Sequence, residues 1–203
     1  MSSLVGLLNY GNSGNTYNVQ KALELAGARV TMIRDKVDLD SVDRIILPGV
    51  GCFKDAMENL AGIQTDLIAH IRKKPTLGIC LGMQILSKIG YEFGETPGLN
   101  FIDAEVKKME VKGKVPHLGW GTLSIVRDSP LLAGISEKDN FYFMHSYEMV
   151  NYTEVIALTD YCNHKFVSVV QKGELYGVQF HPEKSRKAGI IILENFLETG
   201  SRS

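Results

Sequence analysis

Gly78-Ile79-Cys80-Leu81-Gly82 places a cysteine between two glycines, directly after an apolar run. Glycines two residues either side of a nucleophile allow a sharp turn from a strand into a helix, the geometry of a nucleophile elbow. The helix N-terminus that follows favours thiolate over thiol. The alternative for a lone cysteine in such a place is an inert core residue. We interpret Cys80 as a candidate nucleophile because two further motifs accompany it.

The second motif, Phe180-His181-Pro182-Glu183, follows the apolar segment 176–180. A histidine at a strand end can act as a general base, and a carboxylate two residues on can orient its ring. The third motif, Pro48-Gly49-Val50-Gly51, can turn backbone N–H groups toward a developing oxyanion. Each motif alone is more often a simple turn. Together they predict a cysteine nucleophile with a base and an oxyanion site.

The first half of the chain supplies elements that can bring these motifs together. Short apolar runs alternate with amphipathic stretches, a pattern that predicts right-handed βαβ units and a parallel sheet. Ligands gather at the carboxyl ends of such strands. The predicted strands are 4–8, 30–33, 44–47 and 76–80, with one helix ending at Gly27 and another running through Leu67, Ile68 and Ile71.

The second half favours antiparallel strands divided by turns, with a final helix at about 189–197. The predicted strands are 106–109, 123–126, 141–144, 155–158, 166–170 and 175–180. The predicted fold is therefore α/β, an open and mostly parallel sheet flanked by helices with antiparallel strands added in the C-terminal half. A length of 203 residues fits a single domain, 1–203.

Composition narrows the classes of function. The net charge is −1, which argues against nucleic acid or an anionic membrane as the main partner. No apolar run is long enough to span a membrane, and the N-terminus lacks the features of a signal peptide, so we expect a cytoplasmic protein. Three cysteines without a CxxC pair predict neither a disulfide framework nor a structural zinc site. We expect no metal and no cofactor.

The combination of motifs resembles the class I (triad) glutamine amidotransferases over essentially the whole chain. Residues 78–84 and 179–185 match the two signatures of that family. Pro48-Gly49-Val50-Gly51 is similar to one branch, the glutaminase subunits of imidazole glycerol phosphate synthase, and so are residues 115–120 and 142–147. The fold of that family is the α/β fold expected above.

The resemblance implies a mechanism and a set of residues. Glutamine is hydrolysed to glutamate and ammonia through a thioester on the cysteine. The catalytic residues implied are Cys80, His181 and Glu183. The oxyanion would be held by backbone amides of Val50, Gly51 and Leu81. Glutamine would be bound by Gln84, Glu92, Ser146 and Tyr147, where Glu92 is assigned by its spacing from Cys80 alone and could instead be a solvated surface acid.

The same resemblance implies a partner, a (β/α)₈ cyclase subunit that forms a heterodimer with the glutaminase and receives its ammonia. The partner face would include Asn15, Asn18, Trp120, Tyr142 and Lys184. Trp120, flanked by two glycines, would suit an interface anchor. The alternative interpretation is that Trp120 is a half-buried core residue.

Three departures from the family pattern bear on the partner more than on the chemistry. Gly121 replaces a usual asparagine, the loop 9–15 is one residue longer than usual, and Gly90-Tyr91-Glu92 replaces Ser-Glu-Glu. Two alternatives therefore stay open. One is a paralogous glutaminase that supplies ammonia to an ATP-dependent enzyme modifying surface-polysaccharide sugars. The other is a catalytically silent regulatory subunit, although the presence of all three catalytic residues argues against it.

Overall fold

A central sheet of eight strands forms the body of the protein in the computed structural model, which describes residues 3–9 and 15–200. The longer loop predicted at 9–15 falls mostly outside the described residues. The strand order is β2-β1-β3-β4-β14-β13-β12-β9. The first five are parallel and comprise β1 (Leu4–Leu8), β2 (Arg29–Ile33), β3 (Arg44–Leu47), β4 (Thr76–Ile79) and β14 (Leu175–Val178).

Three antiparallel strands extend the sheet beyond β14. They are β13 (His164–Lys172), β12 (Val155–Tyr161) and β9 (Ser124–Ile125). This mostly parallel sheet with antiparallel strands added from the C-terminal half confirms the predicted fold class. The central strands β3, β4 and β14 are buried along their whole length, because layers of structure cover both faces.

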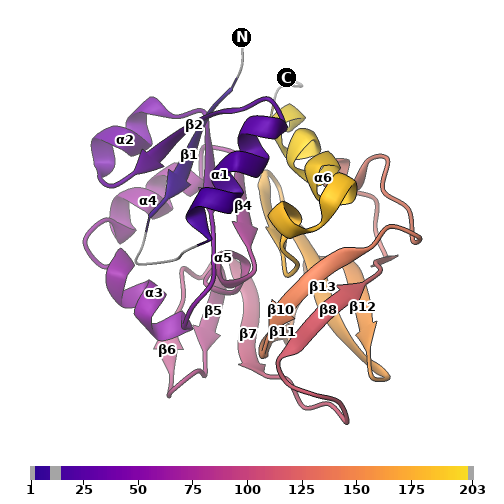
Figure 1. Ribbon diagram of the computed structural model, residues 1–203. Helices are drawn as coiled ribbons and strands as arrows, with labels where there is room; N and C mark the ends of the chain where they lie inside the picture. Colours follow the sequence, from indigo (N-terminus) through magenta and orange to yellow (C-terminus); the bar gives the residue numbers. More distant parts are fainter. Residues whose placement is uncertain (1–2, 10–14, 201–203) are drawn as a thin grey trace.

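Two hydrophobic cores form, one on each face of the sheet. Neighbouring strand residues point to opposite faces, so Leu7 joins one core and Leu8 the other. The first core packs under α1 (Thr16–Leu25), α6 (Arg186–Glu198) and the ribbon of β8 (His117–Gly121) and β10 (Phe141–His145). The helices α1 and α6 lie side by side in Figure 1.

The second core packs under three helices and a separate four-stranded sheet. The helices are α2 (Lys36–Ser41), α3 (Phe53–Leu60) and α4 (Gln64–Ile71). The sheet, in the order β11-β7-β5-β6, consists of β5 (Ser87–Gly90), β6 (Thr96–Pro97), β7 (Ile102–Lys108) and β11 (Tyr147–Val150). A four-residue helix, α5 (Leu81–Gln84), directly follows β4.

Several element boundaries differ from the sequence predictions. The strand predicted at 106–109 is the end of the longer β7, which pairs in parallel with β5 instead of joining the central sheet. The strand predicted at 123–126 shortens to two residues at the sheet edge. The predicted helix through Leu67 is preceded by a separate helix, α3, and the two are divided by a turn at Gly62.

Candidate active site

Cys80 occupies the turn between β4 and α5 in a backbone conformation that residues with side chains rarely adopt. Its φ is 51° and its ψ is −106°. Its N–H donates to the Val178 carbonyl at 2.7 Å, which ties the turn to the neighbouring strand β14. Because β14 leads straight into residues 179–183, this pairing brings the histidine motif next to the cysteine.

The glycines around Cys80 are required by close backbone packing. A Cβ on Gly82 would overlap the carbonyl oxygen of Leu47 at the end of β3, and one on Gly78 would lie 2.5 Å from the Gly82 carbonyl oxygen. A Cβ on Gly49 would lie 2.5 Å from the Leu81 side chain. The glycine spacing read from the sequence therefore reflects two turns, 48–51 and 78–82, pressed against each other.

His181 and Glu183 form a fully buried pair beside the cysteine. His181 Nδ1 lies 2.7 Å from Glu183 Oε1, and both side chains are 0% exposed. The Nδ1 proton is therefore directed at the carboxylate. The other ring nitrogen, Nε2, is buried and has no hydrogen-bond partner among the described residues, which leaves it free to exchange a proton with a reacting group.

The charges around His181 favour its protonated form. Burial lowers its pKa, but the neighbouring Cys80 and the Glu183 carboxylate outweigh this and raise the pKa to about 10. His145 shows the opposite effect, since burial lowers its pKa to about 3. Its Nδ1 donates to the Tyr147 carbonyl at 2.9 Å, so His145 is a neutral structural residue. The two histidines thus differ in charge within one site.

Asn15 lies behind this pair and is only 5% exposed. Its Nδ2 donates to Glu183 Oε1 at 2.7 Å and lies 3.5 Å from His181 Nδ1. Asn15 directly precedes α1 and makes no side-chain capping hydrogen bond there, and α1 packs against the turn 182–184 that carries Glu183. Its side chain therefore offers almost no surface to a partner and instead holds the glutamate in place.

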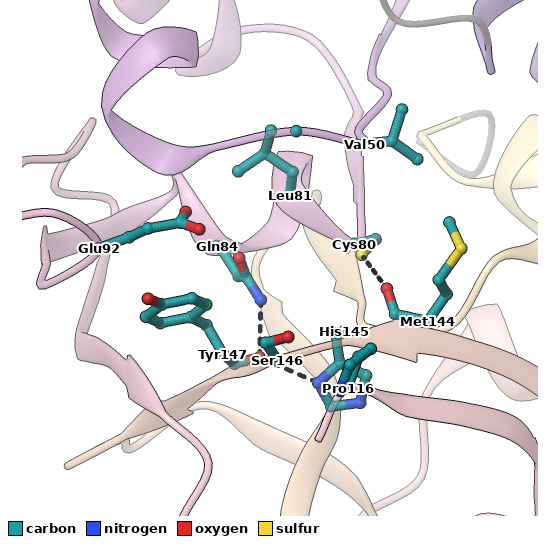
Figure 2. Close-up of a pocket in the computed structure, with 11 residues that line it drawn as sticks. Val50, Cys80, Leu81, Gln84, Glu92, Pro116, Met144, His145, Ser146 and Tyr147 are labelled. Atoms are coloured by element: carbon teal, nitrogen blue, oxygen red, sulfur yellow. Dashed lines mark hydrogen bonds between the residues drawn. The ribbon is translucent and has the colours of Figure 1, made fainter. Parts of the chain in front are cut away.

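A cavity of about 180 Å³ opens in front of Cys80 (Figure 2). It is lined by Val50, Gly51, Cys80, Leu81, Gln84, Glu92, Pro116, Met144, His145, Ser146 and Tyr147. This lining contains all eight residues that the sequence analysis assigned to the nucleophile, the oxyanion site and substrate binding. The other two catalytic candidates are His181 and Glu183. Those two are not part of the lining, and their side chains are fully buried, with His181 next to Cys80.

Polar groups suited to an amino acid line the same cavity as the cysteine. Glu92 Oε2 accepts a hydrogen bond from the Phe53 N–H at 2.8 Å, so the carboxylate is fixed at the beginning of α3. Gln84 Nε2 donates to the Tyr147 carbonyl at 2.9 Å. In the view of Figure 2, Gln84 lies between Cys80 and the pair formed by Glu92 and Tyr147. Glu92 is thus part of the cavity wall and not a freely solvated surface acid.

Of the five residues assigned to a partner face, all but Asn15 keep some exposed surface. Trp120 on β8 is 44% exposed, and its ring meets that of Tyr142, its register partner on β10. The guanidinium of Arg186 lies 4.9 Å from the Trp120 ring centroid. Asn18 and Lys184 are exposed.

Gln179 is a site residue that the sequence analysis did not single out. Its Nε2 donates to Cys80 Sγ at 3.4 Å, and its Oε1 accepts from Gln84 at 3.1 Å. Its spacing from His181 could have indicated this position. Gln179 precedes His181 by two residues, and side chains two residues apart along an extended segment lie on the same side.

No cluster that could hold a metal ion occurs among the described residues, counting groups of three or more His, Cys, Asp or Glu. Within residues 3–9 and 15–200, none of the helices has the length and apolar character needed to cross a bilayer.

Comparison with known proteins gives a consistent result. The family model described as glutamine amidotransferase class-I matches residues 7–199. The imidazole glycerol phosphate synthase subunit HisH 1 of Campylobacter jejuni is 43% identical over 199 residues, covering 95% of this chain and 98% of that protein. The subunit HisH of Methanocaldococcus jannaschii is 43% identical over 198 residues, covering 96% and 99%.

A solved structure of PurLQS from Thermotoga maritima has the same fold. Its TM-score is 0.75 at 19% identity, and the match covers 98% of this chain and 99% of that one. The resemblance read from the motifs is therefore confirmed by the family model and the curated relatives together, and the chain belongs to the class-I glutamine amidotransferase family.

Proposed function

We propose that this chain is the glutaminase subunit of an imidazole glycerol phosphate synthase and acts in histidine biosynthesis. The observation that carries the proposal is the cavity, in which a strained cysteine faces a carboxylate and an amide suited to glutamine. Relatives named as that subunit are 43% identical over nearly the whole chain. They do not favour the alternative of a sugar-modifying system.

The reaction begins with attack of the Cys80 sulfur on the side-chain amide carbon of glutamine. In this proposal the carbonyl oxygen becomes an oxyanion that is stabilised by the backbone amides of Leu81 and of the loop at Val50 and Gly51, residues that line the cavity. His181 then gives its Nε2 proton to the departing ammonia, and the C–N bond breaks to leave a thioester. Water, deprotonated by His181, hydrolyses the thioester to glutamate and restores the thiolate.

The cavity also explains why glutamine is the substrate. Glu92 can pair with the α-ammonium group of an amino acid, and its carboxylate is already oriented by the Phe53 N–H. The backbone of Ser146 and Tyr147 lines the same wall and can bind the α-carboxylate and side chain. A cavity of about 180 Å³ suits a single small amino acid.

Free ammonia is useful only if it reaches its acceptor before water protonates it. We therefore propose a heterodimer with a cyclase subunit that binds the face containing Trp120 and Tyr142. The backbone supports this position, because the His181 N–H donates to the Tyr142 carbonyl at 2.8 Å and Ser185 Oγ accepts from the Tyr142 N–H at 2.9 Å. A partner that contacts Tyr142 thus acts one hydrogen bond away from the catalytic histidine.

The test is glutamate release from glutamine by this chain, measured alone and with the cyclase subunit of the same organism and its nucleotide ligand. We expect strong stimulation by the liganded cyclase. The absence of stimulation, with a cyclase that remains active when ammonia is supplied directly, would contradict the proposed partner.

The role of Cys80 is tested separately by Cys80→Ala. This variant should lose glutamate release and keep cyclase binding, and a glutamine-like electrophile should label Cys80 and spare Cys52 and Cys162 in peptide mapping. Cys52 is a suitable internal control because burial raises the pKa of its thiol. Turnover retained by Cys80→Ala would remove the cysteine from the nucleophile role.

A further inference from the structure

The Cys80 sulfur has a hydrogen-bond donor that does not belong to the three proposed catalytic residues. The Nε2 atom of Gln179 lies 3.4 Å from Sγ, and Gln179 is fully buried. Its backbone N–H donates to the Ser168 carbonyl on β13 at 2.9 Å, so the residue is fixed to the central sheet. A buried amide in contact with a nucleophile is well placed to influence its reactivity.

The orientation of the Gln179 amide follows from its neighbours. The Tyr147 carbonyl can only accept, so the Gln84 side chain must present its NH₂ group there, at 2.9 Å. The same nitrogen lies 3.1 Å from the Gln179 amide, which must therefore present its oxygen to Gln84. The NH₂ group of Gln179 is consequently the end directed at the sulfur.

Two contacts of the sulfur favour different protonation states. The Met144 carbonyl lies 3.8 Å from Sγ and can accept only from the thiol. The Gln179 N–H is closer and is a donor, and a donor stabilises a thiolate more than a thiol because charge-assisted hydrogen bonds are stronger. This closer contact supports the reactive form.

We propose that Gln179 is a further catalytic residue, whose amide N–H stabilises the Cys80 thiolate before attack. The residue neither gains nor loses a proton. Because its oxygen is held by Gln84, which lines the substrate cavity, a single hydrogen-bonded chain runs from the substrate-binding wall to the sulfur. The inference rests on the proposed role of Cys80 as the nucleophile.

The test measures alkylation of Cys80 by iodoacetamide as a function of pH in the full chain without substrate. The variants are Gln179→Leu, which removes the donor, and Gln179→Glu, which also adds negative charge. The matched controls are Gln171→Leu and Gln171→Glu. Gln171 lies on β13, away from the cavity, and its Nε2 donates to the Gly173 carbonyl and to the Tyr176 hydroxyl.

In Gln179→Leu the pH midpoint of alkylation should rise by about one unit, and below that midpoint the rate should fall about tenfold. A tenfold change corresponds to ~1.4 kcal/mol, near the low end for a hydrogen bond to a charged group. Gln179→Glu should shift the midpoint further in the same direction. The Gln171 variants should match the unaltered protein.

An unchanged alkylation profile in a folded Gln179→Leu, with folding checked by circular dichroism, would overturn the proposal and leave Gln179 a structural role. A readout that needs no variant is the side-chain ¹⁵N–¹H NMR signal of Gln179, which should move as Cys80 is titrated. A signal that stays in place through that titration would also overturn it. Neither measurement requires glutamine turnover, so failure here is distinguishable from failure of the proposed function.

Discussion

His181 is the residue at which the electrostatics of the site can be measured directly. Its pKa is raised to about 10 by Cys80 and Glu183 against the opposing effect of burial. Removing the sulfur in Cys80→Ala should therefore lower the pKa of His181, as followed by NMR titration of the imidazole. His117, whose pKa is lowered by burial alone, is the internal control and should titrate unchanged. An unaltered His181 titration would contradict the coupling.

The sign of the same shift predicts a pH dependence of stability. Folded His181 binds its proton more tightly than an unfolded histidine with a pKa of 6.5. Its contribution to stability is therefore fully present below about pH 6.5 and is lost as the pH rises through about 10. Urea unfolding at several pH values should show the unaltered protein losing stability relative to Cys80→Ala across this window.

Asn15 offers a test of how Glu183 is positioned. Asn15→Ala removes the 2.7 Å hydrogen bond to the carboxylate, so we expect kcat to fall about tenfold, the change that ~1.4 kcal/mol produces, while KM changes little. Gln20→Ala is the matched control, because Gln20 makes a similar amide-to-carboxylate bond to Glu24 on the same helix at 2.8 Å. Equal kinetics in both variants would show that Glu183 keeps its place without Asn15.

At the scale of elements, the elbow depends on β3 and α5 meeting without side chains between them. Gly82→Ala forces a Cβ against the Leu47 carbonyl, so unfolding free energy should fall by ~1–3 kcal/mol and turnover should drop as the elbow shifts. Gly62→Ala is the control, because a Cβ there meets nothing within 4 Å. Urea midpoints for the two variants measure the difference, and an equal midpoint would show that the contact can relax.

Elements with strong local signals could be predicted from sequence. The strands 4–8 and 44–47 and the turn at Cys80 lie where their apolar runs and glycines indicate. Those that were missed depend on distant partners. The strand β8 has exposed apolar residues and exists because β10 pairs with it, and β5 forms a parallel pair with β7. No local pattern encodes these pairings, because tertiary context decides strand formation.

The candidate site also has parts that could be predicted from the sequence and parts that could not. The placement of Cys80, His181 and the oxyanion loop follows from motifs whose spacing reports backbone geometry. The contacts of Asn15 with Glu183 and of Gln179 with the sulfur join residues 168 and 99 positions apart. The spacing of Gln179 from His181 indicates that the two side chains share one side of the chain, but which distant atoms Gln179 and Asn15 contact depends on how the finished sheet places its strand ends.

At the scale of the whole molecule, the exposed Trp120 tests the proposed partner face. Trp120→Ala should weaken cyclase binding by ~1–3 kcal/mol in titration calorimetry, because a large ring that is 44% exposed can fill a partner pocket. Val126→Ala serves as the control, since Val126 is also exposed, at 56%, and lies outside the proposed face. Equal affinities would place the partner elsewhere.

The position of β14 in the sheet has a consequence for synthesis on the ribosome. This strand lies between β4 and β13, and residues 179–183, which follow it, complete the site. A nascent chain can therefore expose Cys80 long before its proposed general base exists, and it should not hydrolyse glutamine until residues 179–183 have emerged. Fragments from translation interrupted before His181 should for this reason release no ammonia, so such incomplete chains consume no glutamine.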